Sequence, residues 1–196
     1  MKPPDLILAS RSPRRKELLA LTGLPFSIFP VDTAEIFNPQ MGIEENGAEI
    51  ALLKASAAWD LLDEKRELAV VIGADTLVAM DGAILAKPSG YDDAFRMLQA
   101  LQNRSHEVHT GFALRHATGT HIECVTTGVT FEPMSDNEIR HYLDFAQPFD
   151  KAGSYGIQDP VMACYVRKIE GCYYNVVGLP LSRLCLALKR CIPESF

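Results

Sequence analysis

The chain has 196 residues, of which 47% are hydrophobic and 22% are charged, and its formal net charge is −6. A chain of this size and composition suits one globular domain, and we expect residues 1–196 to form it. The acidic balance excludes broad, sequence-independent binding to nucleic acid polymers or to anionic membranes, which needs a net basic face, so any recognition of phosphate has to be local.

The first third of the chain predicts two strands and two helices. A helix start is marked by Ser12 followed by Pro13, a good N-cap residue and a proline in the first helical position. In chain order, the elements are a strand at 6–10, a helix from Ser12 to Gly23, a strand at 26–29, an irregular stretch that holds Glu35, and a long amphipathic helix over 45–62.

The rest of the chain mixes hairpins with helices. Residues 68–74 are uniformly apolar, as a strand covered on both faces should be, and this strand would deliver Asp75 at its C-terminal end. The elements that follow are a hairpin of 77–79 with 84–86, a helix over 91–101, strands at 107–115 and 121–131, a helix from the capping box 135–138 to Phe145, an antiparallel pair at 162–169 and 173–177, and a last helix from Pro180. This order predicts an α/β domain with a mixed, partly antiparallel sheet flanked by helices.

Nothing in the sequence indicates export or membrane insertion. The run at 6–9 is too short for the apolar part of a signal peptide, and no run approaches the roughly 18 apolar residues of a membrane span. The five cysteines include no C-x-x-C pair and no histidines at zinc-ligand spacing. We therefore expect reduced thiols, a cytoplasmic location and no membrane partner.

The segment Ser10-Arg11-Ser12-Pro13-Arg14-Arg15 is a candidate phosphate site. The sequence has neither G-x-G-x-x-G after a strand nor G-x-x-x-x-G-K-[ST], so some other element has to hold phosphate. Arginines in the first turn of a helix are unfavourable unless an anion is shared there. Because Arg14 and Arg15 face different ways, one could bind phosphate while the other forms an internal ion pair.

Asp75 is the candidate for the chemistry itself. A carboxylate at the end of a buried strand could bind a hard cation such as Mg²⁺ or act as a general base for water, although a turn or cap residue is an equal alternative. Glu35 gains weight only if it converges with Asp75 on one metal. Lys54 lies at the edge of the buried helix face, where a lysine ordinarily snorkels, and Lys87 and Lys151 are ambiguous alone.

The glycine-bearing stretch 153–158 ends in a candidate base reader. The amide of Gln158 can match the imide edge of uracil or thymine, with one donor beside one acceptor, but it could also flip to match cytosine. Tyr155 could stack on a base, although an aromatic residue in a loop more often packs into the interior.

Taken together, six segments in register from residue 6 to about 188 resemble the Maf family of nucleoside triphosphate pyrophosphatases. They are residues 8–15, Gly73-Ala74-Asp75-Thr76, Lys87-Pro88, His106-Glu107-Val108-His109-Thr110-Gly111, Asp150-Lys151-Ala152-Gly153-Ser154-Tyr155-Gly156-Ile157-Gln158, and Val177-Gly178-Leu179-Pro180-Leu181.

The resemblance implies cleavage of a nucleoside triphosphate between its α and β phosphates, with a divalent cation, Mg²⁺ or Mn²⁺. Asp75 corresponds to the catalytic acceptor carboxylate, and Asp75 with Glu35 to the metal ligands. The form of residues 150–158 resembles the branch that acts on dTTP and UTP. The substrate-binding positions implied are Ser10, Arg14, Arg15, Lys54, Thr76, Lys87, Lys151 and Gln158, of which Arg14, Thr76 and Gln158 fall on specificity positions.

The resemblance also implies a fold and an assembly. The expected fold, Maf/inosine triphosphatase-like, is a single elongated domain with a cleft between two lobes, and a homodimer is common. One departure stands out: family members commonly carry two acidic residues where this chain has Ala34-Glu35. Asp32 is the nearest carboxylate that could replace the missing one.

Three alternatives to this function remain. The same cations could bind a nucleotide without hydrolysing it, as in a regulator linked to cell division; a carboxylate at Asp75 argues against that, since phosphates repel it unless a metal intervenes. The reaction could also act on 7-methyl-GTP, as in the other branch of the family, or on modified pyrimidine nucleotides.

Overall fold

The computed structural model describes residues 5–193, except for the side chains of residues 64 and 65. The chain forms two compact units, each built from separate stretches of sequence. Within the described range, the first unit holds 5–75, 110–125 and 178–193, and the second holds 76–109 and 126–177. Among the described residues, no helix is long and apolar enough to cross a membrane.

The strands form one mixed sheet, which confirms the predicted fold class. Its order is β2-β1-β3-β5-β6-β7, and β4 pairs with β3 outside this path. β1 is parallel to β2 and β3, whereas β4 is antiparallel to β3 and β7 is antiparallel to β6. The strands are β1 (Asp5–Leu8), β2 (Phe26–Ile28), β3 (Ala69–Met80), β4 (Ala83–Leu85), β5 (Ser105–His116), β6 (Gly119–Phe131) and β7 (Val166–Glu170).

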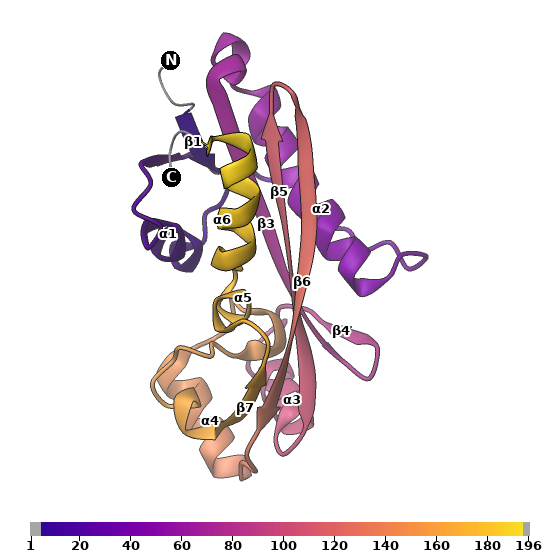
Figure 1. Cartoon of the computed structure of the whole chain (residues 1–196). Coiled ribbons are helices and arrows are strands. Elements are labelled where there is room, and N and C mark those ends of the chain that lie inside the picture. Colours follow the sequence, from indigo (N-terminus) through magenta and orange to yellow (C-terminus); the bar gives the residue numbers. More distant parts are fainter. Residues whose placement is uncertain (1–4, 194–196) are drawn as a thin grey trace. The chain divides into compact units, whose positions relative to one another are not determined.

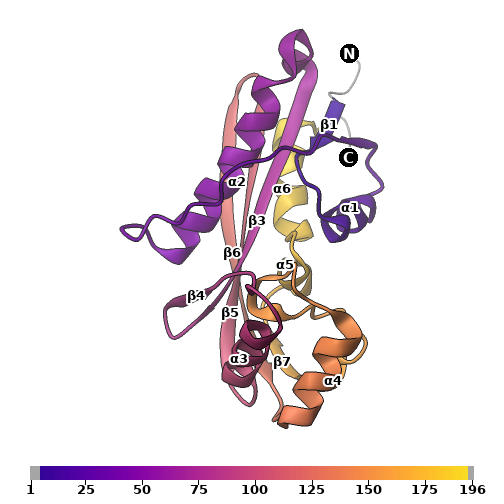
Figure 2. The same ribbon diagram turned by 180° about the vertical axis from the view of Figure 1, so that it is seen from behind.

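Among the described residues, three α-helices belong to the first unit (Figure 1). They are α1 (Pro13–Ala20), α2 (Ile43–Asp60) and α6 (Leu181–Cys191), and a 3-10 helix, η1 (Asp63–Leu68), follows α2. In the view from behind, α2 lies on the near side of this part of the sheet and α6 on the far side, so the two helices cover opposite faces (Figure 2). The core under α2 joins Ala51, Ala55 and Trp59 to Val71 and Ala113 of the strands.

Helix α2 approaches the backbone of the sheet unusually closely. A Cβ added to Gly73 of β3 would lie 2.2 Å from the carbonyl oxygen of Ala51, and one added to Gly111 of β5 would lie 2.1 Å from that of Gly47. Only glycine allows two backbones to come this close. Because side chains alternate along a strand, Asp75 lies on the same face of β3 as Gly73 and therefore faces α2.

The second unit is built around α3 (Tyr91–Leu101) and α4 (Asp136–Ala146), which pack against each other. The predicted capping box opens α4, with the Ser135 Oγ accepting from the Glu138 backbone N–H. Buried Leu98, Phe131 and Tyr142 contribute to the core of this unit. Its remaining elements are η2 (Ala152–Ser154), η3 (Met162–Tyr165) and α5 (Tyr173–Val177).

Two expectations about the strands were wrong. The strand expected to end before Asp75 runs on to Met80 as one element, so Asp75 lies within β3 rather than at a strand end. An aspartate favours turns, but Asp75 is tolerated inside the strand because the Lys54 side chain of α2 forms an ion pair with it. A buried ion pair thus keeps the carboxylate within the strand.

The second wrong expectation is the antiparallel pair at 162–169 and 173–177. Residues 162–165 form a 3-10 helix, β7 pairs with β6 instead, and residues 173–177 form α5. Short apolar runs cannot be assigned by periodicity alone. The helix is fixed by buried Asn175, whose Nδ2 donates to the Val108 carbonyl at 2.9 Å and to Thr127 Oγ1 at 3.0 Å.

Candidate active site

An ion-pair cluster on the first unit joins three of the predicted residues. Lys54 Nζ lies 2.7 Å from Glu35 Oε1 and 2.6 Å from Asp75 Oδ1. The side chains of Lys54 and Asp75 are 12% and 9% exposed, and that of Glu35 is 36% exposed. Two carboxylates from distant parts of the sequence therefore converge on one cation.

The local folding of the first unit explains this convergence. Lys54 lies on α2 between Ala51 and Ala55, the residues whose backbone meets Gly73. Two residues further along β3, Asp75 shows its side chain to the same helix. Glu35 reaches the cluster from the irregular stretch between β2 and α2. The close helix contact thus sets the distance between Lys54 and Asp75.

The pair Glu35 and Asp75 suits a hard divalent cation. Both offer carboxylate oxygens, and the cation at which they already converge is the Lys54 ammonium. Mg²⁺ is commonly held through one or two carboxylates, with substrate phosphates and water completing its shell. Among the described residues no group of three or more His, Cys, Asp or Glu side chains has the geometry of a metal site. Glu35 and Asp75 are thus the two residues of this cluster that could hold such an ion.

Asp32 does not supply a third carboxylate to this cluster. Its two oxygens receive the two terminal nitrogens of Arg11, each at 2.6 Å, and both side chains are largely exposed. Arg11 is thus the partner of Asp32. Asp32 therefore does not replace the acidic residue that family members commonly carry at the position of Ala34.

The segment from Ser10 to Arg15 forms the start of α1, as the sequence predicts. Ser12 caps the helix by accepting from the Arg15 backbone N–H, and the buried Ser10 Oγ accepts from the Ser12 N–H at 3.2 Å. The Arg15 guanidinium donates through Nε to the Gly178 carbonyl at 2.9 Å and through a terminal nitrogen to Ser10 Oγ at 3.5 Å.

Electrostatics connect Arg15 with the acidic cluster. Burial lowers the pKa of the Arg15 guanidinium, and the charge of Arg14 lowers it further, whereas Asp75 and Glu35 raise it. Of the two arginines, Arg15 is held internally by a carbonyl and a hydroxyl oxygen. Arg14, at the preceding position of the helix, is half-buried.

Four predicted residues belong to the second unit: Thr76, Lys87, Lys151 and Gln158. Thr76 follows Asp75 on β3 and points to the opposite face, and Lys87 is exposed after β4. Lys151 Nζ lies 3.2 Å from Asp150 Oδ1 and 3.9 Å from Asp159 Oδ2, with the lysine side chain 14% exposed. Gln158 is exposed in a turn.

Tyr155 packs into the interior rather than offering a stacking surface. Its ring meets Phe131 edge-on at 4.9 Å between centroids and His106 at 5.3 Å. The Tyr155 hydroxyl lies 2.7 Å from His106 Nε2. Of the two interpretations of Tyr155, packing is the correct one.

Sequence reasoning missed two residues that hold the 150–158 segment, namely Tyr142 and Asp159. The Tyr142 hydroxyl donates to Asp159 Oδ2 at 2.7 Å and accepts from the Gly156 N–H at 3.0 Å. Tyr142 carries no local signal, since it lies among the apolar positions of α4. The position of Asp159 directly after the motif was the one available hint.

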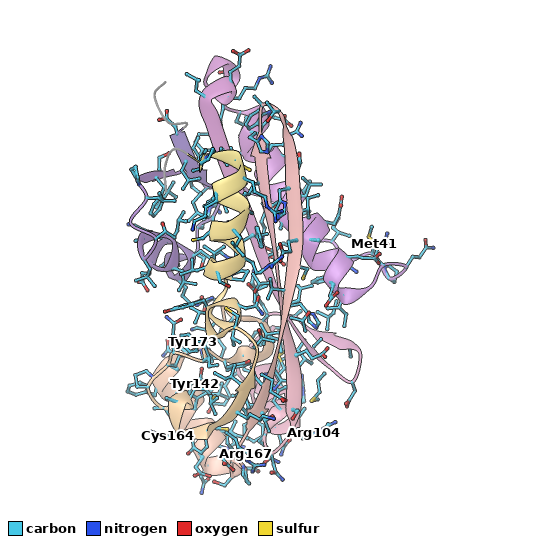
Figure 3. The ribbon with its side chains drawn as sticks, viewed as in Figure 1. Met41, Arg104, Tyr142, Cys164, Arg167 and Tyr173 are labelled. Carbon is cyan, nitrogen blue, oxygen red and sulfur yellow. The ribbon has the colours of Figure 1, made fainter. Side chains whose placement is uncertain are left out.

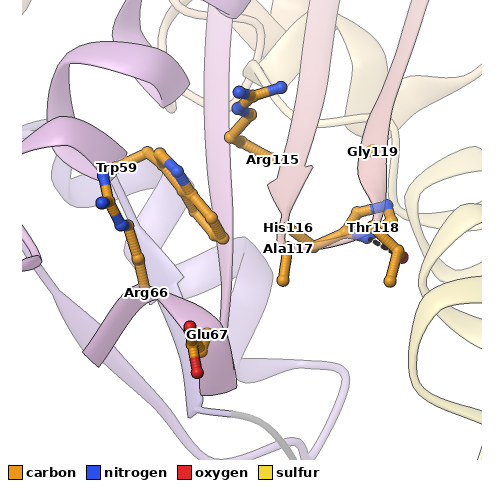
Figure 4. A pocket seen from close by; sticks show the side chains of 8 residues that line it. All are labelled: Trp59, Arg66, Glu67, Arg115, His116, Ala117, Thr118 and Gly119. Carbon is orange, nitrogen blue, oxygen red and sulfur yellow. Dashed lines mark hydrogen bonds between the residues drawn. The ribbon is translucent and has the colours of Figure 1, made fainter. Parts of the chain in front are cut away.

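A separate hollow in the first unit contains none of the predicted site residues (Figure 4). It lies at the turn between β5 and β6, and Arg115 stands over the Trp59 ring with 5.8 Å from Cζ to the ring centroid. Its lining consists of Trp59, Arg66, Glu67, Arg115 and residues 116–119.

The structure is thus a mixed α/β protein in which two carboxylates pair with one lysine. The first helix of this protein carries two arginines in its first turn. The sequence model of the Maf family, described as "Maf-like protein", matches residues 5–191. The chain therefore belongs to the Maf family, which confirms the resemblance seen in its motifs.

Curated relatives match this chain over nearly its whole length. A protein of Pelodictyon phaeoclathratiforme is 57% identical over 96% of this chain and 98% of its own, and one of Chlorobium chlorochromatii is 56% identical over 98% of each. A protein of Bacillus velezensis is 46% identical over 94% of this chain and 95% of its own. All three carry the name dTTP/UTP pyrophosphatase.

A likeness among solved structures is more distant. The structure of the Staphylococcus aureus Ham1 protein aligns with a TM-score of 0.46 and 16% identity, over 65% of this chain and 71% of that chain. This degree of similarity is too low to support an argument about fold or function.

Proposed function

We propose that the protein is a nucleoside triphosphate pyrophosphatase that hydrolyses dTTP and UTP to the monophosphate and pyrophosphate. The proposal is supported by the names of relatives up to 57% identical over nearly the full length. The structural observation that carries it is the convergence of Glu35 and Asp75 on Lys54. A site that only bound phosphate would be weakened by two carboxylates, unless cations stood between them and the anion.

In this proposal, Asp75 accepts the proton of the water that attacks the α phosphorus. Before substrate and cation bind, Lys54 at 2.6 Å fixes the orientation of this carboxylate. Lys54, Arg15 and Ser10 would contact the triphosphate and neutralise its charge. The internal bonds of Arg15 to Gly178 and Ser10 fix its direction before the substrate arrives.

We further propose that Glu35 and Asp75 hold the divalent cation, Mg²⁺ or Mn²⁺. Bound by these carboxylates, such a cation would supply positive charge that stabilises the pyrophosphate leaving group. Lys54 would then shift from the carboxylates toward the phosphates, since cation and ammonium compete for the same oxygens.

The remaining candidate residues are proposed to bind the rest of the nucleotide. Lys87 and Lys151 would contact phosphate oxygens, while Arg14, Thr76 and Gln158 would select the nucleotide, with the Gln158 amide on the imide edge of thymine or uracil. We also propose that residues 1–196 act as one domain. A homodimer remains the expected assembly. The five unpaired cysteines favour a cytoplasmic enzyme.

A panel of nucleoside triphosphates tests this function. dTTP, UTP, CTP, GTP, 7-methyl-GTP and a modified pyrimidine triphosphate are incubated with Mg²⁺ or Mn²⁺, and pyrophosphate is resolved from orthophosphate. We expect pyrophosphate and monophosphate from dTTP and UTP. Preferential cleavage of a purine nucleotide would keep the reaction and overturn the specificity, and tight nucleotide binding without any product would support the regulator instead.

A further inference from the structure

The loop between α4 and β7 is tied to α4 at its centre. Within the second unit, the Tyr142 hydroxyl makes two hydrogen bonds to this loop, one to Asp159 Oδ2 at 2.7 Å and one from the Gly156 N–H at 3.0 Å. Figure 3 marks Tyr142 among the side chains of this unit. One side chain of α4 thus holds both ends of the short turn that contains Gln158.

Tyr142 is suited to act as a permanent clamp. Its side chain is fully buried in the core of the second unit. Burial raises the pKa of the Tyr142 hydroxyl, and its hydrogen bond to Asp159 raises it further, so the hydroxyl stays protonated and keeps donating. A lone pair of the same oxygen accepts from the Gly156 N–H, which would otherwise lose its partner.

The turn itself closes around the Asp159 carboxylate. The Asp159 N–H donates to the Gly156 carbonyl at 3.0 Å, which closes the backbone from Gly156 to Asp159. A Cβ on Gly156 would lie 2.7 Å from Asp159 Oδ1, so the carboxylate can take this place only because residue 156 is glycine. Gln158 is the exposed residue of the closed turn.

The same carboxylate extends toward Lys151. Lys151 Nζ lies 3.9 Å from Asp159 Oδ2, so the oxygen that receives the Tyr142 hydroxyl also attracts the lysine. The lysine side chain is mostly buried at this position. Asp159 therefore links Lys151 to the turn that carries Gln158.

A second anchor holds the middle of the loop. Tyr155 is buried, with its hydroxyl 2.7 Å from His106 Nε2, and Gly153 adopts a φ of +66° beside Val78. With residues 153, 155, 156 and 159 all fixed, the backbone that carries Gln158 has little freedom.

We propose that Tyr142, acting through Asp159 and Gly156, is a positioning residue for base selection. This inference rests on the proposed function, in which Gln158 reads the base. A glutamine amide can serve uracil in one orientation and cytosine in the other. Selection between uracil and cytosine requires the Gln158 amide to have a fixed position relative to the base edge. The hydrogen bonds of Tyr142 hold the turn that carries Gln158 and so fix this position.

The test compares UTP with CTP as substrates of the wild type and of Tyr142→Phe. Removing the hydroxyl releases Asp159 and Gly156 while keeping the ring in the core. We expect the ratio of kcat/KM for UTP over CTP to fall by about tenfold, the equivalent of one hydrogen bond, mainly through KM, with kcat for UTP nearly unchanged.

Tyr165→Phe is the matched control. The Tyr165 hydroxyl also bonds a carboxylate on α4, Glu138 Oε1 at 3.0 Å, and neither of these residues belongs to the segment 150–159. We expect it to leave the UTP:CTP ratio unchanged. Asp159→Asn is the second variant, in case Tyr142→Phe does not fold; it keeps an acceptor for Tyr142 but loses the charge, and it should lower the ratio by a smaller factor of about threefold.

The outcomes separate the inference from the proposed function. A wild type that prefers UTP and a folded Tyr142→Phe that keeps this preference would overturn the positioning role alone. Equal loss of activity on every nucleotide would also overturn it, because a structural role would act on all substrates alike. A wild type without preference for pyrimidines bearing an imide edge would overturn the proposed function, and the inference with it.

Discussion

Lys54 Nζ and Asp75 Oδ1 lie 2.6 Å apart, across a contact between α2 and β3 that only glycine at position 73 permits. Lys54 also holds Glu35 at 2.7 Å. The cluster therefore depends on a backbone contact as much as on its own charges.

Asp75→Asn should lower kcat by about 10²-fold or more, because the amide cannot accept the proton from water. The measurement is pyrophosphate release from dTTP, with circular dichroism to show that the variant is folded. Asp32→Asn is the matched control, since Asp32 pairs with Arg11 at the surface, and it should retain turnover. Near-normal turnover in a folded Asp75→Asn variant would remove Asp75 from its proposed role.

Lys54→Met should tighten the binding of Mn²⁺ to the nucleotide-free protein by about threefold or more, because two carboxylates would face each other without the ammonium. Electron paramagnetic resonance of free Mn²⁺ measures this directly and needs no turnover. The KM for dTTP should rise at the same time. An unchanged affinity for Mn²⁺ would speak against Glu35 and Asp75 as its ligands.

Gln158→Ala should weaken discrimination among bases while leaving the chemical step largely intact, because Gln158 is exposed and distant in sequence from Asp75. The measurement is kcat/KM for dTTP, UTP and CTP. Gln99→Ala, an exposed glutamine beside Asp136, is the control. If all three substrates lost activity equally, Gln158 would not be the base reader.

Gly73→Ala should lower the free energy of unfolding by about 3 kcal/mol, since the added methyl group would meet the Ala51 carbonyl at 2.2 Å and force α2 away from β3. Urea unfolding measures the change. Gly90→Ala, where an added Cβ meets nothing within 4 Å, should be nearly neutral. Equal stability of the two variants would mean that α2 can move outward at little cost.

Stability should fall as the pH is lowered, through His106. Burial lowers the pKa of His106 from 6.5 to about 4. Between these two pH values, the unfolded chain therefore binds a proton at His106 that the folded chain does not bind. The neutral, buried ring thus contributes to the free energy of unfolding at neutral pH, and this stabilising contribution is lost as the pH falls. We expect a loss of about 2 kcal/mol between pH 7 and pH 5.

Urea unfolding of the wild type and His106→Gln at both pH values isolates this effect, because other titrating groups cancel in the difference. The variant lacks the titrating ring, so its stability should change less with pH. Parallel pH dependence of the two proteins would show that His106 does not carry the effect.

Much of the fold could be predicted from local patterns. The capping residues Ser12 and Ser135 and the helical spacing of α2 marked helices that the structure contains with small shifts of their ends. Where local patterns failed, long-range contacts decided. The local pattern predicts a strand end at Asp75, but the ion pair with Lys54 keeps this residue within the strand. The local pattern also predicts a strand at 173–177, but the hydrogen bond from Asn175 to the Val108 carbonyl holds this segment as a helix.

The sequence by itself determined the family, the α/β class and the residues Glu35, Lys54, Asp75 and Gln158 as candidates, because motifs and periodicity are local properties of the chain. Only the tertiary structure decided that Glu35 and Asp75 meet at one ammonium, that Asp32 belongs to Arg11, and that Tyr142 and Asp159 hold the turn of Gln158. These contacts join residues far apart in the sequence. Such contacts depend on how closely two backbones approach and on which buried polar groups need partners. A local sequence pattern determines neither of these.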